Sequence, residues 1–430
     1  MMKFTDEYLQ CNFGIDKRIL ELVSKSEKKI EHIFGKYEDI CAYNQYKVLD
    51  AFQKNGVSDR HFNWNTGYGY DDIGREVTEK VFAEVFKAEK AIVRTQIVNG
   101  THALSLILSG ILRPGDEIIY ISGKPYDTLE EVIGIRGNEM GSLNEFGITY
   151  KEVPLKNNKL DFTGIKKAIS DKTKMVTLQR ATGYSWRKAI EIDDIENAVQ
   201  EVKAIDDKIV FMVDNCYGEF LDILEPTEIG ADVMAGSLIK NPGGGLALSG
   251  GYIVGKSQLI DKIMYRLTCP GIGGECGLTF GQTRNILQGI FMAPNVVKGA
   301  IKGAILCGEV YSQLGYDTCP KTGDARSDII QGIKFFSEEK VIGFCQGVQE
   351  AAPIDSFVKP EPWDMPGYDT PVIMAAGAFI QGSSIELSAD APIREPYIAY
   401  FQGGLSYEHS KFGIIKSLDN LYKKGLLDLK

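Results

Sequence analysis

The clearest pattern in the chain is an alternation of short apolar runs with longer amphipathic stretches, beginning near residue 91. Each run has the length of a β-strand, and near-continuous apolarity is typical of strands buried on both faces of a mainly parallel sheet. Amphipathic helices are expected between most of the runs, for example over 192–202. The pattern predicts an α/β domain with seven strands, at 91–93, 117–121, 148–150, 175–178, 209–213, 233–235 and 252–254.

Different patterns flank this region on both sides. The first 55 or so residues predict helices outside the main sheet, because apolar residues recur there at helical spacing. A long helix-compatible stretch runs from about Gly277 to Leu314, and Pro- and Gly-punctuated short strands with a closing Lys-rich helix follow it. We therefore expect a helical segment at 1–55, a large domain at 56–300 and a small C-terminal α+β domain at 301–430.

Charge and composition narrow the class of protein. The 430 residues carry 48 Lys and Arg against 58 Asp and Glu, and the net charge of -10 has the wrong sign for gripping nucleic acid. Among the longest apolar stretches, 372–380 is far shorter than the roughly 20 residues that span a bilayer. Four histidines and eight scattered cysteines give little support for a zinc site. We expect a cytoplasmic protein with no nucleic-acid or membrane partner.

Two motifs near the start of the sheet could bind a ligand. Asn99-Gly100-Thr101-His102 opens a helix after the first strand, where free backbone N–H groups form an anion site or simply a helix cap. Tyr126 follows the strand that ends at Ile121, at the edge where parallel strands form a ligand crevice. Tyr126 could stack on a planar ring, or it could be a buried structural tyrosine.

Two further motifs follow later strands. Asp214 ends an apolar strand and could pair with a cationic ligand atom or serve a turn, and Asn215 beside it could do either. Lys240 lies in an apolar stretch before a Gly-rich loop, a setting expected to lower the pKa of its amine and make it nucleophilic. Taken singly, a solvated loop lysine is the commoner case. Ser237, three residues earlier, could face the same phosphate as Thr101.

The order of the four motifs carries more information than any one of them. A phosphate turn, a stacking aromatic residue, a carboxylate and a lysine follow one another across one α/β domain. Together they describe a pyridoxal phosphate site, with a Schiff base to Lys240 and the pyridinium nitrogen paired with Asp214. A nicotinamide dehydrogenase is disfavoured, because no G-x-G-x-x-G follows the first strand.

These residues also resemble a known group of proteins. Val-Asp-Asn at 213–215, Ser-Leu-Ile-Lys at 237–240 and Gly-Tyr-Asp-Asp-Ile-Gly-Arg at 69–75 are similar to motifs of fold type I pyridoxal phosphate enzymes. Within that group the chain resembles the Cys/Met metabolism enzymes, such as cystathionine lyases and methionine γ-lyase, and more closely the aluminium resistance family. The resemblance runs from about residue 30 over nearly the whole chain. It implies an aspartate aminotransferase-type large domain with a mainly parallel seven-stranded sheet.

The resemblance also implies a role for each site residue. Lys240 would bind the cofactor and then carry protons as acid and base. Asp214 would keep the ring nitrogen protonated, and Tyr126 would stack on the ring. The cofactor phosphate would be held by Gly100, Thr101 and Ser237.

Subunit contacts and substrate binding are less closely matched. In the family a Tyr and an Arg reach the phosphate of a neighbouring subunit's cofactor, and Tyr70, with Arg75 second, is the counterpart here; a homodimer or homotetramer is expected. The segment 179–187 departs from the family pattern and lacks the asparagine that touches the ring hydroxyl. For the substrate carboxylate, Arg394 is the nearest candidate and Arg180 the second; the alternative is that both form ordinary surface ion pairs.

The predicted activity is that of a pyridoxal phosphate-dependent amino-acid lyase. It would remove the Cα proton and then eliminate a β- or γ-sulfur group from a sulfur-containing amino acid. Two alternatives stay open at this point. One is other chemistry with the same cofactor, such as an aldolase, aminotransferase or decarboxylase reaction. The other is a cofactor-binding protein with regulatory or lost activity, for which the altered segment around Thr182 is the clue.

Overall fold

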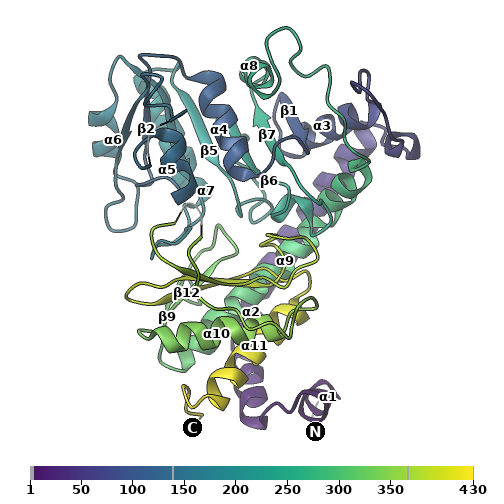
Figure 1. Ribbon diagram of the computed structural model, residues 1–430, viewed down its shortest axis with the longest axis vertical. Helices are drawn as coiled ribbons and strands as arrows, with labels where there is room; N and C mark the ends of the chain where they lie inside the picture. The colour runs from purple at the N-terminus through teal and green to yellow at the C-terminus, as the bar shows by residue number, and fades with distance from the viewer. Residues whose placement is uncertain (1–3, 138–139, 366–367, 430) are drawn as a thin grey trace. The chain divides into compact units, whose positions relative to one another are not determined.

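A computed structural model describes residues 4–137, 140–365 and 368–429 (Figure 1). Its larger sheet has seven strands in the order β1-β7-β6-β5-β4-β2-β3. Neighbouring strands from β6 to β3 are parallel, whereas β7 is antiparallel to both β6 and β1. The seven strands expected from the apolar runs are confirmed as β1 (Lys90–Arg94), β2 (Glu117–Tyr120), β3 (Thr149–Glu152), β4 (Thr173–Gln179), β5 (Val210–Asp214), β6 (Val233–Ser237) and β7 (Gly251–Gly255).

Strand register brings three of these carboxyl ends together. Gln179, the last residue of β4, is paired with Asp214, the last residue of β5. Asp214 is in turn paired with Ala235 of β6, two residues before Ser237. Because the three strands are parallel, the segments that follow them leave the sheet at the same edge, where ligands of α/β proteins bind.

Helices cover this sheet and close its apolar core. The apolar helix α4 packs on α8 and against β6 and β7, and one buried cluster joins α4, α5 and α8 to the strands. Helix α7 has two acidic residues in its first turn, which suits the positive end of the helix dipole. The helices of this unit are α3 (Ile73–Val85), α4 (Gly100–Ile111), α5 (Asp127–Ile133), α6 (Phe162–Ala168), α7 (Ile192–Ile205) and α8 (Ser257–Leu267).

The chain divides into two compact units. The unit just described comprises Ala42–Gly183 and Lys188–Pro294, and the other contains the residues up to Cys41, Tyr184–Arg187 and those from Asn295 onward. In that second unit an antiparallel sheet of order β10-β11-β12-β9-β8 packs against α10, which also contacts α11. Its elements are α1 (Phe4–Phe13), β8 (Asp317–Cys319), β9 (Gln331–Lys334), α10 (Glu338–Glu350), β10 (Val372–Ala375), β11 (Ser388–Pro392), β12 (Ile398–Gln402) and α11 (Tyr407–Lys423).

Two long helices cross the boundary between the units, so the division differs from the three segments expected from the sequence. Helix α2 (Lys17–Lys54) and helix α9 (Thr283–Gln313) are continuous. Helix α9 begins later than the expected Gly277, because Gly277 and Gly281 have φ angles of 117° and 72°. It is long and apolar enough to span a bilayer, but 72% of its most apolar window is buried within the protein, as in the core helix of a soluble protein.

Candidate active site

A cavity of about 180 Å³ lies at the edge of the sheet where β4, β5 and β6 end. Five separate segments line it: the start of α4, the residue before α5 and the chain at and after the end of each of these three strands. Six of the ten predicted site residues are among the lining residues, although the sequence places them up to 140 positions apart. The lining comprises Asn99, Gly100, Thr101, Leu104, Tyr126, Gln179, Ala181, Gly183, Asp214, Cys216, Tyr217, Ser237, Ile239 and Lys240.

One end of the cavity is the N-terminus of α4. The Asn99 side chain caps the helix by accepting a hydrogen bond from the His102 N–H at 2.8 Å. The first N–H groups of a helix have no acceptor within it, so they attract anions. A Cβ at Gly100 would lie 3.4 Å from Ser237 Cβ, which places Ser237 beside this helix start. The Thr101 hydroxyl shares a 2.6 Å hydrogen bond with Thr128. This end suits a phosphate group.

Asp214 lies at the end of β5 and is only 8% exposed. Its Oδ1 accepts a hydrogen bond from the Cys216 N–H at 3.1 Å. Burial raises the pKa of the Asp214 carboxyl, and the nearby Lys240 and Cys216 oppose that rise. Among the ion pairs of the described residues none includes Asp214. A buried carboxylate needs a cationic partner to stay ionised, and a protonated ring nitrogen would provide one.

Lys240 follows β6 and precedes the short turn Asn241–Gly243, and its Nζ lies 4.2 Å from the centroid of the Tyr217 ring. Burial by itself lowers the pKa of the Lys240 amine, but Cys216, Tyr217, Asp214 and Glu219 raise it, and the net shift is upward. The lowered pKa expected from the apolar sequence is therefore wrong. The segment after β5 supplies acidic side chains that the local sequence around the lysine does not reveal.

Residues of the segment after β4 also line the cavity; the sequence analysis associated this segment with the cofactor ring but predicted none of its lining residues as site residues. Gln179 ends β4, and its Nε2 donates to the Ala181 carbonyl at 3.1 Å. Gly183 has a φ of 56°, and a Cβ there would lie 3.6 Å from Tyr126 Cδ2. The signal that could have found these residues is their position at the carboxyl end of a parallel strand. Cys216 and Tyr217, after β5, carry the same signal.

Asn215 and Arg180 do not line the cavity. Both are fully buried, and Arg180 Nη1 donates to Asn215 Oδ1 at 2.8 Å. The Asn215 amide in turn donates to Glu225 Oε2 at 3.1 Å, so both ends of the amide are engaged. The structure gives these two residues a place in a buried polar network next to β5. Their predicted contacts with cofactor and substrate stay predictions.

The remaining candidates lie on exposed or distant segments. Tyr70 is 58% exposed, in the segment before α3. Arg394 is exposed in the turn between β11 and β12, which belongs to the other compact unit. Arg75 is only 3% exposed, and its guanidinium donates to the carbonyls of Gly69 and Gly277 at 2.6 and 3.2 Å. The Arg75 guanidinium therefore holds two backbone segments of this protein together.

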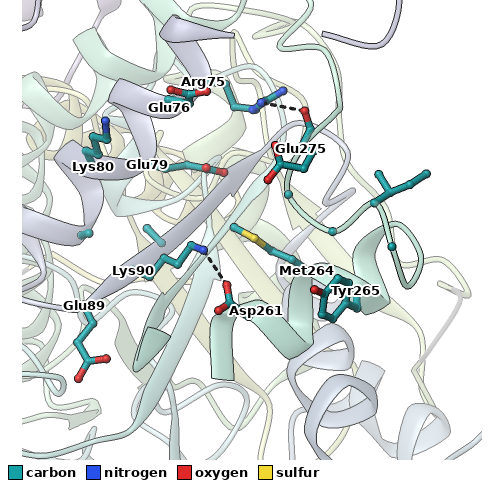
Figure 2. A pocket seen from close by; sticks show the side chains of 16 residues that line it. Arg75, Glu76, Glu79, Lys80, Glu89, Lys90, Asp261, Met264, Tyr265 and Glu275 are labelled. Atoms are coloured by element: carbon teal, nitrogen blue, oxygen red, sulfur yellow. Dashed lines mark hydrogen bonds and ion pairs between the residues drawn. The ribbon is translucent and has the colours of Figure 1, made fainter. Parts of the chain in front are cut away.

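A larger cavity of about 700 Å³ shares no lining residue with the first (Figure 2). Helix α3, the start of β1, helix α8 and the loop 271–275 line it. Arg75 Nη2 donates to the Glu275 carbonyl at 3.3 Å, and Lys90 Nζ lies 2.6 Å from Asp261 Oδ1. The charged groups that Figure 2 shows joined by dashed lines are thus already engaged within the protein.

The family model described as methionine gamma-lyase matches residues 19–422. The chain belongs to the methionine gamma-lyase family. It is 50% identical over 413 residues to the uncharacterized protein YnbB of Bacillus subtilis, covering 95% of this chain and 98% of that one. This confirms the predicted family, and the family's cofactor is pyridoxal 5'-phosphate.

Solved structures of family members agree with the fold. A candidate cystathionine beta-lyase involved in aluminum resistance from Clostridium acetobutylicum superimposes with a TM-score of 0.95 at 48% identity, covering 98% of this chain and 99% of that one. A carbon-sulfur lyase involved in aluminum resistance from Clostridium novyi NT gives 0.94 at 51% identity, covering 98% and 100%. The predicted fold class is confirmed, and the protein is a carbon-sulfur lyase-like enzyme of the pyridoxal phosphate-dependent type.

The chemistry of the small cavity fits this cofactor. The α4 N-terminus offers N–H donors to a phosphate, Asp214 offers an acceptor to a protonated ring nitrogen, and Lys240 offers an amine to an aldehyde. Asp214 is buried without a cationic partner, which is the feature that such a ring nitrogen would satisfy. No group of three or more His, Cys, Asp or Glu within the described ranges is arranged to hold a metal ion.

Proposed function

We propose that this protein cleaves a carbon–sulfur bond of a sulfur-containing amino acid by β- or γ-elimination. One observation carries the proposal: Lys240 and Asp214 line the same small cavity as the N-terminus of α4. Neither side chain forms an ion pair with another residue of the described ranges, so both are available to a ligand. The family and the names of the solved relatives support the reaction class.

Each residue has a defined task in this proposal. Bound pyridoxal phosphate supplies an electron sink that stabilises negative charge at the substrate's Cα. Lys240 Nζ binds the cofactor, takes the proton from Cα and returns a proton during elimination. Asp214 keeps the ring nitrogen protonated, and Tyr126 covers the ring. Gly100, Thr101 and Ser237 hold the phosphate.

The substrate carboxylate needs a separate partner, and we propose Arg394 for this task. Its guanidinium is exposed in a turn, whereas that of Arg180 is buried and donates to Asn215. A planar guanidinium can bind a carboxylate with two parallel hydrogen bonds. Replacing Arg394 with Lys should raise KM for the amino acid more than it lowers kcat. An unchanged KM would leave Arg180 as the remaining candidate.

We also propose that two copies of the chain share each active site, as a homodimer or homotetramer. Three aromatic residues of one short segment are strongly exposed: Trp64 at 71%, Tyr68 at 73% and Tyr70 at 58%. Exposed aromatic groups of this kind are enriched at subunit interfaces. Sedimentation measurements should give a dimer or tetramer, and Tyr70→Phe should weaken cofactor binding. A monomer that binds the cofactor as tightly as the oligomer would contradict this arrangement.

A panel of sulfur amino acids tests the reaction. Incubation with the cofactor-loaded protein should release a thiol and a 2-oxo acid, and borohydride reduction should attach the cofactor to Lys240. A colourless preparation with no adduct at Lys240 would overturn the proposed site. Transfer of the amino group to an added keto acid would indicate an aminotransferase instead. Colour without turnover across the panel would indicate a binding protein without activity.

A further inference from the structure

A second buried carboxyl group, Glu219, packs against the strand and turn that carry Lys240 and has no task in the mechanism above. It is fully buried in the segment after β5, five residues beyond Asp214. Its Oε1 accepts a hydrogen bond from the Tyr252 hydroxyl at 2.7 Å. Its Oε2 is buried and has no hydrogen-bond partner in the described part of the chain. An unpartnered oxygen of this kind is costly, so it calls for a functional explanation.

The residues that hold Glu219 flank Lys240 on both sides. Gly236 precedes Ser237 in β6, and a Cβ there would lie 2.6 Å from Glu219 Oε1. Gly236 is also paired with Tyr252 across β6 and β7, so the glycine makes room for the carboxyl group and its donor. Asn241, next to Lys240, donates from its side chain to the Glu219 carbonyl at 3.1 Å. The strand and turn that position the lysine therefore also position this carboxyl group.

The backbone around Glu219 is strained. Tyr217 and Phe220 have φ angles of 68° and 64°, a conformation that side chains of this size rarely adopt. Such strain persists only where the surrounding structure enforces it, and it occurs most often at functional sites. The same segment places Tyr217 against the Lys240 amine and Glu219 in the interior. The segment after β5 therefore supplies both the aromatic ring and the buried carboxyl group near the lysine.

The charged and titratable groups that face Glu219 are Lys240, Tyr252, Cys216 and Glu225. Burial raises the pKa of Glu219 to about 8, while the Tyr252 hydrogen bond and Lys240 lower it and Glu225 raises it. Burial also raises the pKa values of the Cys216 thiol and of the Tyr252 hydroxyl, so both are neutral at pH 7. Besides Cys216, Tyr217 and Asp214, Glu219 is the group that raises the pKa of Lys240.

We propose that Glu219 is a positioning residue whose ionisation raises the proton affinity of the Lys240 nitrogen, so that this nitrogen stays protonated to higher pH. Glu219 touches neither substrate nor cofactor and acts through the lysine. The proposal rests on the proposed function, because it concerns the nitrogen that binds the cofactor. At neutral pH the Glu219 carboxyl carries a proton, because burial raises its pKa to about 8, and it becomes negatively charged above that pH.

The test is the visible absorption of the cofactor-loaded protein as a function of pH, because that absorption changes when the lysine-bound nitrogen loses its proton. Glu219→Gln keeps the size of the side chain and an acceptor for Tyr252 but cannot ionise. We expect its midpoint to lie about one pH unit below that of the unaltered protein. Tyr252→Phe removes the donor that helps Glu219 to ionise, so it should shift the midpoint in the same direction by less.

Glu225→Gln is the matched control. Glu225 is also fully buried, and it accepts hydrogen bonds from the Phe220 N–H at 2.9 Å and from Asn215, but it is not among the groups that face Lys240. Its midpoint should move far less than that of Glu219→Gln, and upward if at all, because Glu225 raises the pKa of Glu219. A merely structural role of the loop would instead move both glutamine variants together, and that result would overturn the proposal.

Other outcomes also decide the question. An unchanged midpoint in Glu219→Gln overturns the proposal, and if that variant does not fold, an unchanged midpoint in Tyr252→Phe does so. Failure of the proposed function looks different. In that case the unaltered protein has no visible absorption band, or it has a band that is unchanged in Lys240→Ala. A band that depends on Lys240 but not on Glu219 leaves the proposed function standing and refutes this inference alone.

Discussion

The two cavities of the α/β unit differ in size and in what their charged residues do. In the larger cavity, beside α3 and α8, Lys90 pairs with Asp261 at 2.6 Å. Glu79, another lining residue of this cavity, pairs with Arg94 at the same distance. The Arg75 guanidinium donates hydrogen bonds to the backbone carbonyls of Glu275, which lines this cavity, and of nearby Gly277. These groups satisfy one another, which stabilises the local structure.

The smaller cavity shows the opposite arrangement. Asp214 and Lys240 line it, and Glu219 lies near them, yet these three residues make no ion pair with one another or with other described residues. Their pKa values are all shifted upward, with burial the leading cause for the two carboxyl groups. Perturbed and unpaired ionisable groups in a cleft are a stronger sign of a functional site than volume alone. The comparison therefore favours the smaller cavity as the site of chemistry.

Replacing Lys240 with Ala should produce the largest effect. The variant loses both the amine that binds the cofactor and the base that removes the Cα proton, so carbon–sulfur cleavage should fall by about 1000-fold or more. Steady-state release of 2-oxo acid from a sulfur amino acid measures this loss. Lys90→Ala in the larger cavity is the control, and its rate should stay within about twofold. Equal losses in the two variants would remove the distinction between the cavities.

Asp214→Asn should have the next largest effect. A neutral amide of the same shape cannot balance a positive charge on the ring nitrogen, and a charged hydrogen bond of this kind contributes about 1.5–3 kcal/mol. Turnover should fall by about 100-fold, while the fold stays intact because the amide can still accept from the Cys216 N–H. Measuring kcat together with the circular dichroism spectrum distinguishes a loss of turnover from a loss of fold. A rate close to that of the unaltered protein would argue against Asp214 as the partner of the ring nitrogen.

The buried carboxyl groups also predict how stability depends on pH. Burial raises the pKa of Glu219 from its ordinary value of 4.5 to about 8. Because the folded protein holds this proton more tightly than the unfolded chain, the contribution is complete below about pH 4.5 and is lost as pH rises towards 8. Between pH 5.5 and 8 the unaltered protein should lose about 3 kcal/mol more stability than Glu219→Gln. Urea unfolding at each pH measures this, and parallel curves would contradict it.

The sequence predicted most of the sheet and much of the cavity lining. Most strands of this sheet are buried, so apolar runs revealed them, although β3 is an exposed edge strand; the carboxyl-end rule placed Asp214 and Tyr126 at the ligand edge. Side-chain partners across strands could not be predicted in this way. The Glu219–Tyr252 contact depends on the pairing of β6 with β7, and the raised pKa of Lys240 depends on side chains at positions 214–219, well before it in the chain.

Gly100→Ala should weaken cofactor binding without harming the fold. The added Cβ would lie 3.4 Å from Ser237 Cβ and 3.5 Å from Cys216 Sγ, which is ordinary contact within the protein. The methyl group would nevertheless occupy space at the phosphate end of the cavity. We expect the Kd for pyridoxal phosphate to rise by about tenfold, which corresponds to about 1.4 kcal/mol. Equilibrium dialysis gives the Kd, and an unchanged value would place the phosphate elsewhere.

Asp261→Asn should have the smallest effect, and it tests the larger cavity directly. The Lys90–Asp261 pair is partly exposed, with 41% and 49% of the two side chains accessible, so water screens the attraction between them. Exposed pairs of this kind contribute about 0.2–1 kcal/mol, and the free energy of unfolding should fall by no more than that. Turnover and cofactor affinity should not change, because Asp261 does not line the small cavity. A clear loss of turnover or of cofactor affinity would show that the larger cavity takes part in the reaction. Ion pairing among the residues of a cavity would then not indicate a purely structural role.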